Sequence, residues 1–146
     1  MPQHFTLDQA RNLLPRVKEN LQQALVLKRE HEKAEQSLQT IVNRVQMMGG
    51  MVLNRQEMVG HRSRMDATSM RLREVVEEIH ELGCQIKDLD VGLLDFPTFY
   101  RGNEVLLCWK LGEEDITFWH GLEEGFRGRK PIDDEFLENH RGDPVE

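Results

Sequence analysis

A stretch near the end of the chain, CWKLGEEDITFWHGLEEGFRGRKPI from Cys108 to Ile132, holds most of the side chains that could do chemistry. It contains a thiol at Cys108, an imidazole at His120, two indoles and several charged groups. A thiol and an imidazole can hold a transition metal, or act as nucleophile and base, if their side chains meet. The strand pairing of this stretch therefore decides what it can do.

Side-chain alternation predicts that Cys108 and His120 do not meet. The GEED sequence after Leu111 predicts a tight hairpin turn that pairs Leu111 with Ile116. Because neighbouring side chains of a strand point to opposite faces, Cys108 and His120 then fall on opposite faces of the sheet. A one-residue slip would bring them together but would move Ile116 and Phe118 off the core face. We therefore expect Cys108 to be a buried structural thiol that shares no ligand with His120.

Carboxylates near His120 give a second metal hypothesis. Glu123 and Glu124 follow it by about one helical turn, and His-x-x-Glu pairs bind metals in carboxylate bundles when a second such pair is present. Here that second pair would come from another copy of the chain. Alternatively, His120 is hydrogen-bonded at the sheet edge, the glutamates are solvated, and Asp95 pairs with Lys110 across two strands. The candidate metal ligands are His120, Glu123, Glu124 and Asp95.

Three groups of side chains are candidates for contacts with a partner. The methionines around Gly49 lie at an expected turn between helices, where they adapt to a partner surface or cap one another. Trp119 is expected to cover the second face of the sheet, or to offer a platform on which a base or sugar could stack. Two arginines in GFRGRKPI could bind an anion, or could only neutralise nearby acids. The interaction candidates are Met47, Met48, Met51, Trp119, Arg127 and Arg129.

An apolar stripe predicts a long first helix. It begins with a capping-box pattern, Thr6 followed three residues later by Gln9. Apolar residues then recur at steps of three and four, which is the period of one helix face. Pro15 falls inside this stripe, and its missing backbone donor predicts a kink that sets off a short opening segment. The stripe starts with Leu7, Ala10, Leu14, Val17, Leu21 and Ala24.

A second stripe runs in one register from Met58 to Leu89 and predicts a second long helix. Gly49-Gly50 is the best helix stop between the two stripes. Residues 1–90 are therefore predicted to form a long antiparallel, coiled-coil-like helical hairpin. Gly60 weakens the second arm, and a break there is the main alternative.

The period changes after Asp90. The sequence LLDFPTFYRGNEVLLCWKLGEEDITFWHGL predicts three short strands with turns at Gly102-Asn103 and at GEED. Pro97 has no backbone donor, so its strand is predicted to lie at a sheet edge. We expect a small three-stranded antiparallel β module over residues 91–132, packed on the base of the hairpin. An acidic tail, residues 133–146, is expected to be a short helix or disordered. The fold class is α+β, mainly α.

Composition and charge narrow the function classes. No apolar run approaches the roughly 18 residues of a membrane span, so we expect no membrane association. The first residues lack the pattern of a signal peptide, and Cys84 and Cys108 lack the spacing of a metal or redox motif. We therefore expect reduced thiols in a cytoplasmic protein.

Charge is divided unevenly along the chain. Residues 1–87 hold 13 Lys+Arg and 11 Asp+Glu, a net charge of +2, whereas residues 88–146 hold 6 and 15, a net charge of −9. The acidic half would repel a phosphate backbone, so nucleic acid is not the expected partner. A contact through a basic helix face stays open as an alternative. This face comprises Arg44, Arg55, Arg62, Arg64, Arg71 and Arg73, against Glu57 and Asp66.

Two segments resemble a known family. FTLDQARNLLP at the start and GLLDFPTFYRGNEVLLCWKLGEEDITFWHGLEEGFRGRKPI near the end are similar to the bacterial family catalogued only as domain of unknown function 2203. The specific motifs are G-L-x-D-F-P, C-W-x-L-G-E, W-H and G-F-x-G-R. The resemblance extends to about Ile132, implies a bacterial cytoplasmic protein and implies no activity. The motif positions are Gly92, Asp95, Cys108, Trp109, Glu113, Trp119, His120, Gly125, Gly128 and Arg129.

Two functional hypotheses follow. The first is a non-enzymatic interaction or scaffold protein, because no nucleophile–base pair, phosphate loop or full metal ligand set is evident. Apolar patches at Leu25–Leu27 and Val75-Val76 predict a homodimer or higher homo-oligomer, with a further protein as a possible partner. The second is a protein that depends on a divalent metal or a small ligand. Its site would be built from Asp95, Glu113, His120, Glu123 and Glu124.

Overall fold

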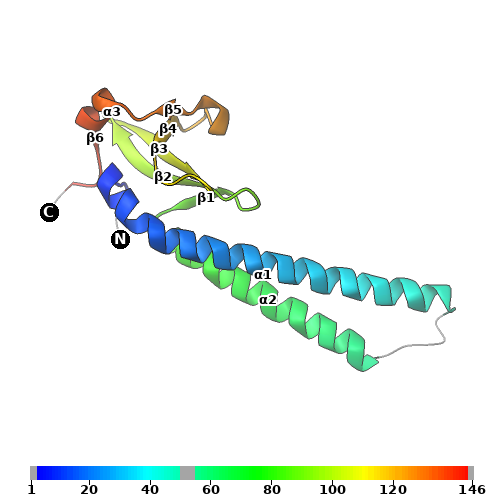
Figure 1. The fold of residues 1–146 in the computed structure, drawn as a ribbon. Coiled ribbons are helices and arrows are strands. Elements are labelled where there is room, and N and C mark those ends of the chain that lie inside the picture. Colours follow the sequence, from blue (N-terminus) through cyan, green and yellow to red (C-terminus); the bar gives the residue numbers. More distant parts are fainter. Residues whose placement is uncertain (1–2, 50–54, 145–146) are drawn as a thin grey trace. The chain divides into compact units, whose positions relative to one another are not determined.

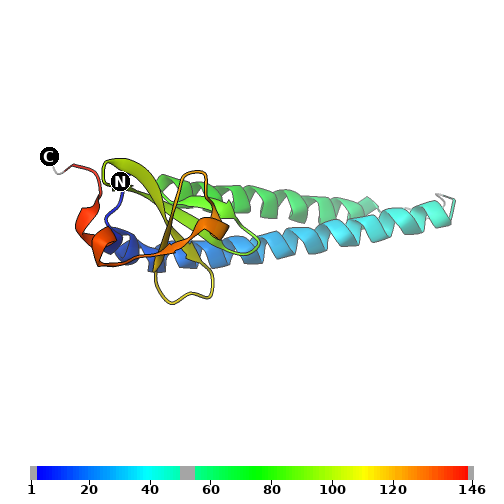
Figure 2. The same cartoon turned by 90° about the horizontal axis from the view of Figure 1, so that it is seen from above.

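The computed structural model describes residues 3–49 and 55–144, and it is mainly helical with an antiparallel sheet (Figures 1 and 2). The expected α+β fold class is confirmed. Contacts group the chain into two compact units, unit 1 (Met1–Leu21 and Glu77–Glu146) and unit 2 (Gln22–Val76). The elements are α1 (Leu7–Met47), α2 (Arg55–Glu81), β1 (Gln85–Asp88), β2 (Leu93–Tyr100), β3 (Asn103–Lys110), β4 (Phe118–Gly121), the 3-10 helix η1 (Phe126–Gly128), β5 (Lys130–Pro131), α3 (Asp134–Asn139) and β6 (His140–Arg141).

Helix α1 begins as the sequence predicts. The Thr6 hydroxyl accepts the Gln9 backbone N–H at 3.1 Å, and the Gln9 side-chain oxygen accepts the Thr6 N–H at 2.9 Å. This reciprocal capping box satisfies two of the donors that a helix start leaves unpaired. The helix then continues through Pro15, whose side chain is exposed, so the expected short opening segment does not form a separate helix. All six residues that start the predicted stripe are buried: Leu7, Ala10, Leu14, Val17, Leu21 and Ala24.

Unit 2 is a helical hairpin in which the rest of α1 and most of α2 lie side by side and run in opposite directions (Figures 1 and 2). Among the described residues, its buried apolar side chains are Ala24, Ala34, Ile41 and Val75. Helix α1 ends at Met47, and Gly49 adopts a φ of 66°, which is typical of a glycine that ends a helix. Helix α2 runs unbroken through Gly60. The predicted hairpin is therefore confirmed.

Helix α2 is shorter than the second stripe predicts. It ends at Glu81 instead of continuing to Leu89. Gly83 adopts a φ of 95° and donates its N–H to the His80 carbonyl at 2.9 Å, so a left-handed glycine closes the helix. The chain then enters strand β1, where Ile86 pairs with Leu94 of β2. Ile86 of the predicted stripe therefore belongs to the sheet, and Leu89 lies in the turn after β1.

The sheet has six strands where three were expected. Its order is β1-β2-β3-β4-β5, and β6 also pairs with β2. Strand β2 therefore has partners on both sides, and the prediction that it lies at an edge is wrong. Pro97 is tolerated because β1 pairs with β2 only as far as Asp95, and the pairing of β2 with β6 starts at Phe99. Between them the Pro97 carbonyl accepts the Phe5 N–H at 2.7 Å.

The face of the sheet that carries Phe96 and Trp109 forms the main core of unit 1. The rings of Phe5 and Phe96 pack edge to face with centroids 5.6 Å apart, and the Lys18 Nζ lies 5.7 Å from the Trp109 ring centroid. The chain's first helical turns therefore cover this face of the sheet. The fully buried apolar side chains here are Phe5, Leu21, Leu94, Phe96, Leu107 and Trp109.

The described part of the acidic tail, residues 133–144, contains the short helix α3. Asp133 caps α3 by accepting the Phe136 N–H at 2.8 Å, and Phe136 is buried. Its ring stacks on Tyr100 and lies 5.0 Å from the Trp119 ring. Beyond β6, the Asp143 carboxylate accepts the Gln3 N–H at 2.7 Å, which holds down the pKa of Asp143. Of the two alternatives for the tail, the short helix is therefore the one observed.

Candidate metal-binding site

Strands β3 and β4 pair one residue out of the predicted register. Cys108 pairs with Phe118, and Leu106 pairs with His120. Paired residues point to the same side of the sheet, so Cys108 shares a face with Phe118. His120 lies two residues after Phe118 on the same strand and therefore points to that face as well. The prediction that they lie on opposite faces is wrong. Cys108 also pairs with Asp95 of β2 on its other side.

The loop between β3 and β4 explains why Ile116 stays in the core in this register. No tight hairpin turn forms, because residues 111–117 make a longer loop between the strands. Ile116 lies in this loop, is fully buried, and its carbonyl accepts a hydrogen bond from Arg11 at 3.0 Å. Its side chain therefore reaches the core without obeying strand alternation. The Trp109 Nε1–H anchors the loop by donating to the Glu113 carbonyl at 3.0 Å.

Three buried side chains meet on this face: Asp95 of β2, Cys108 of β3 and His120 of β4. One ligand atom from each lies within 4.8 Å of the others. Asp95 and Cys108 are fully buried, and His120 is 3% exposed. Each of the three residues lies within a strand that pairs with a neighbour, so the sheet holds the backbone of all three residues in place. A carboxylate oxygen, a thiol sulfur and an imidazole nitrogen form a ligand set typical of zinc-class metals.

Hydrogen bonds define the protonation of the His120 ring. Nδ1 lies 2.7 Å from the Gly121 carbonyl, which can only accept, so Nδ1 carries a proton. Nε2 lies 3.0 and 3.1 Å from the two carboxylate oxygens of Asp95. Both ring nitrogens therefore make hydrogen bonds, and neither is free to take a proton from Cys108. This arrangement is unlike a cysteine–histidine nucleophilic pair.

The Cys108 thiol is held in its neutral form. Burial raises its pKa to about 12, the negative Asp95 carboxylate beside it acts in the same direction, and the Arg129 guanidinium opposes them. A reactive cysteine needs a lowered pKa and access to solvent, and Cys108 has neither. Nucleophilic catalysis by this thiol is therefore not supported by its surroundings. Binding to a cation remains chemically open, because a cation would stabilise the thiolate.

A surface pocket of about 190 Å³ leads to the site. Asp95 and His120 contribute to its wall, together with Lys87 and Glu123 at its polar side. Its remaining lining residues are Leu93, Leu122, Gly125 and Phe126. The carboxylate and imidazole are thus buried but border a space that a small ion or molecule could enter.

Arg129 and Glu113 form a second polar feature near the site. An Arg129 guanidinium nitrogen lies 2.5 Å from a Glu113 carboxylate oxygen, and the guanidinium lies 3.9 Å from the centroid of the Phe118 ring. The other Glu113 oxygen accepts the Lys110 backbone N–H at 2.7 Å. These contacts hold the 111–117 loop against β4, so both residues support the site through its framework. An anion-binding role for Arg129 therefore competes with an existing ion pair.

The other predicted metal ligands lie outside the cluster. Glu124 pairs with the Lys130 ammonium at 2.6 Å and accepts the Gly121 N–H at 2.9 Å, and both contacts lower its pKa. Glu123 is exposed on the wall of the pocket. The predicted Asp95–Lys110 ion pair does not form, because Lys110 pairs with Leu93 and its ammonium lies over the Phe126 ring.

The predicted interaction residues are divided between the two units. In unit 2, Met47 is 88% and Met48 48% exposed, and Met51 lies outside the described residues. In unit 1, Arg127 is exposed in η1, whereas Trp119 is half-buried. The Lys130 ammonium lies 4.7 Å from the Trp119 ring centroid, so a base or sugar would have to displace it.

The protein is therefore an α+β protein that combines a long helical hairpin with an antiparallel sheet, and the sheet carries a buried Asp–Cys–His cluster. The chain matches the model of the family described as "Uncharacterized conserved protein (DUF2203)" over residues 3–132 and belongs to this family. None of the curated proteins and none of the solved structures compared with the chain gives a match. Helices long and apolar enough to cross a membrane are absent from residues 3–49 and 55–144.

Proposed function

We propose that unit 1 binds a divalent metal ion of the zinc class through Asp95, Cys108 and His120. The observation that supports this proposal is the mutual approach of the three ligand atoms, all within 4.8 Å, in a buried place. A tetrahedral ion with bonds of about 2.0–2.3 Å holds its ligand atoms about 3.3–3.7 Å apart. Small side-chain movements would therefore bring the three atoms to one ion.

Charge and orientation favour the same ligand set. Burying three polar side chains together is costly unless their charges and hydrogen bonds are compensated. A divalent cation with an Asp95 carboxylate, a Cys108 thiolate and a neutral His120 gives a site of zero net charge. The Nδ1–H bond to the Gly121 carbonyl fixes the ring with Nε2 toward Asp95, as second-shell partners of metal-bound histidines do.

The pocket beside Asp95 and His120 supports an accessible fourth position. Structural zinc sites use four protein ligands, whereas sites with three leave one position to water or a substrate. Within the described residues the cluster has three members, and two of them border the 190 Å³ pocket. A small molecule with a metal-binding oxygen is the class of ligand that this position would take.

Replacement of the native ion by Co²⁺ tests the proposal. The purified protein should contain about one transition metal ion per chain by elemental analysis. After removal of that ion, Co²⁺ should produce a thiolate-to-metal charge-transfer band together with visible bands of tetrahedral cobalt. Cys108→Ser should lose the charge-transfer band, and His120→Gln should weaken Co²⁺ binding by at least about tenfold.

Cys84→Ala is the matched control, because Cys84 is the other buried, unpaired cysteine and lies outside the cluster. It should keep the charge-transfer band at full strength. The proposal is wrong if wild-type protein gives no thiolate band with Co²⁺, or if Cys84→Ala loses the band while Cys108→Ser keeps it. Circular dichroism of each variant would verify that it is folded.

A second candidate function is that of a cytoplasmic interaction protein that forms homo-oligomers. The observation that favours it is an apolar groove in unit 2, at the end of the hairpin where α1 ends and α2 begins, and one of its lining residues, Val59, is 64% exposed. Two reduced, buried thiols support a cytoplasmic location. Analytical ultracentrifugation tests the interaction role: a species of one chain's mass up to millimolar concentration would contradict self-association.

A further inference from the structure

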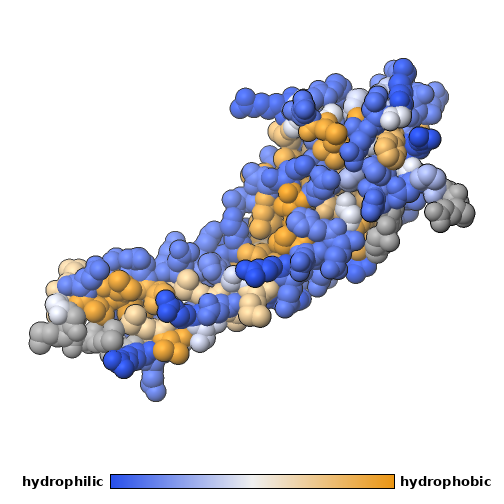
Figure 3. Space-filling view, turned by 180° about the vertical axis from the view of Figure 1, so that it is seen from behind, coloured by the Kyte–Doolittle hydropathy of each residue, from blue (hydrophilic) through white to orange (hydrophobic). Residues whose placement is uncertain are grey.

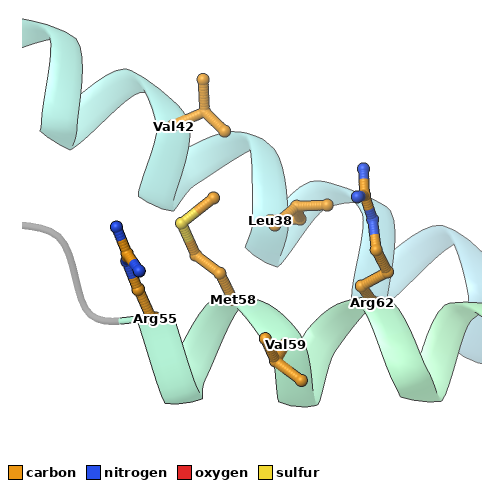
Figure 4. Close-up of a pocket in the computed structure, with 6 residues that line it drawn as sticks. All are labelled: Leu38, Val42, Arg55, Met58, Val59 and Arg62. Carbon is orange, nitrogen blue, oxygen red and sulfur yellow. The ribbon is translucent and has the colours of Figure 1, made fainter.

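The groove in unit 2 lies between the two arms of the hairpin (Figure 4). It has a volume of about 340 Å³. Helix α1 contributes two apolar side chains, and α2 contributes residues at i, i+3, i+4 and i+7, which is one face of that helix. We call it the tip groove. Its lining residues are Leu38, Val42, Arg55, Met58, Val59 and Arg62.

The tip groove combines apolar surface with unpaired positive charge. Figure 3 shows apolar side chains gathered on this end of the hairpin. Among the residues that the structure describes, Arg55 and Arg62 make no ion pair. Residues 38–64 contain four arginines and one glutamate, a net charge of +3. A surface that covers this groove must therefore be apolar and acidic.

These properties argue against two occupants. Single-stranded nucleic acid binds on aromatic platforms, and residues 22–76 contain no Phe, Trp or Tyr. Two tip grooves facing each other would bring two surfaces of charge +3 together, which like-charge repulsion opposes. The occupant should instead be a negatively charged segment with large exposed apolar side chains.

Unit 1 carries such a segment, residues 122–126, with the sequence LEEGF. Leu122 is 55% exposed and Phe126 is 45% exposed, and both are unusually accessible for large apolar side chains. Between them, Glu124 is paired with Lys130, whereas Glu123 makes no ion pair within the described residues. The segment itself carries two glutamates and no basic residue, a net charge of −2.

We propose that the tip groove of one copy binds the Leu122–Phe126 segment of a second copy of this chain. Leu122 and Phe126 would contact the apolar floor of the groove, and Glu123 would pair with Arg55 or Arg62. This inference rests on the interaction role proposed above and is independent of the metal proposal. Because the segment also lines the pocket beside His120, docking would cover one wall of that pocket.

Paired substitutions on α2 test the groove. Val59 and Met70 are both 64% exposed on α2, but only Val59 lines the groove. Sedimentation equilibrium from micromolar to millimolar protein should show a self-association that Val59→Glu weakens by at least about tenfold and Met70→Glu leaves unchanged. High salt should weaken it as well, because charge pairs contribute. Thermal melts of both variants would confirm that the hairpin is intact.

Substitutions in unit 1 test the partner surface. Leu122→Glu should weaken association as much as Val59→Glu does. Arg62→Glu and Glu123→Lys should each weaken it, and a mixture of these two variants should associate more tightly than either alone, because the reversed charges again attract.

The outcomes separate this inference from the interaction role itself. Association that Val59→Glu abolishes and Leu122→Glu leaves intact would overturn the inference but keep the groove as an interface. Equal effects of Val59→Glu and Met70→Glu would overturn the groove assignment. Wild-type protein that stays monomeric at millimolar concentration would overturn both.

Discussion

Cys108 and His120 lie on the same face of the sheet, because Cys108 pairs with Phe118 across β3 and β4 instead of with Trp119. This single register brings a thiol from β3 beside the Asp95–His120 pair that joins β2 to β4. The geometry of the candidate metal site therefore depends on a strand register, and the register depends on the loop between the strands.

The buried Asp95–His120 pair should contribute strongly to the stability of the metal-free protein. Asp95→Ala leaves the His120 Nε2 without its partner in a site that is 3% exposed or less. Breaking a buried pair in this way costs about 3–5 kcal/mol in the free energy of unfolding. Urea denaturation in the presence of a chelator measures this loss. Glu123→Ala, at an exposed carboxylate, should change stability by about 0.5 kcal/mol or less, and equal losses would contradict the expectation.

Ile116 should behave as a core residue although it lies in a loop. It is fully buried, so Ile116→Ala should lower the free energy of unfolding by about 2–5 kcal/mol. Thr117→Ala is the neighbouring control, since Thr117 is exposed and should lose about 0.5 kcal/mol or less. If Ile116→Ala were as mild as Thr117→Ala, the loop would not anchor the β3–β4 register as described.

Gly92 should tolerate a side chain less well than Gly102. Both have positive φ, 70° and 82°, so alanine is strained by about 1–2 kcal/mol at either position. A Cβ at Gly92 would also lie 2.5 Å from the Leu111 Cβ, whereas a Cβ at Gly102 meets nothing within 4 Å. Gly92→Ala should therefore lower the melting temperature clearly more than Gly102→Ala. Similar melting temperatures would show that Leu111 can move away.

The buried thiols should make the protein less stable at alkaline pH. Burial raises the pKa of Cys84, so the folded state keeps this thiol proton above about pH 9 while the unfolded state loses it. Stability that is present below pH 9 is then lost as pH rises, by about 1.4 kcal/mol per pH unit for each thiol.

Cys84→Ala isolates this effect from the titration of other groups. The variant should show a shallower fall in the free energy of unfolding between pH 9 and pH 10.5, roughly 1.4 kcal/mol per pH unit less steep than wild type. Denaturation curves at several pH values measure both slopes. Parallel slopes would mean that Cys84 does not retain its proton in the folded state.

Much of the helical part of the fold could be predicted from the sequence because its signals are local. The six predicted stripe residues from Leu7 to Ala24 are buried, and the capping box of Thr6 and Gln9 forms as expected. Helical periodicity and capping depend on residues three or four positions apart, so neighbouring residues suffice to reveal them. Gly83 was the missed signal, since a glycine after the last helical turn ends α2 before the stripe does.

The candidate site was only partly accessible to the same reasoning. Residue types point to Asp95 and His120, but a tight turn at GEED predicts that Cys108 lies on the opposite face from His120. The predicted sheet carries apolar residues on both of its faces, so side-chain alternation alone does not identify the face that packs in the core.

Tertiary structure decided the register, the number of strands and the partner of each polar group. Ile116 enters the core from a loop, and β1, β5 and β6 are short strands that exist only through pairing with distant segments. A one-residue difference in register exchanges the two faces of a strand, and its energy depends on packing across the whole sheet. Local patterns along the chain are enough to specify the helical hairpin, whereas the long-range pairing of β2, β3 and β4 brings Asp95, Cys108 and His120 together.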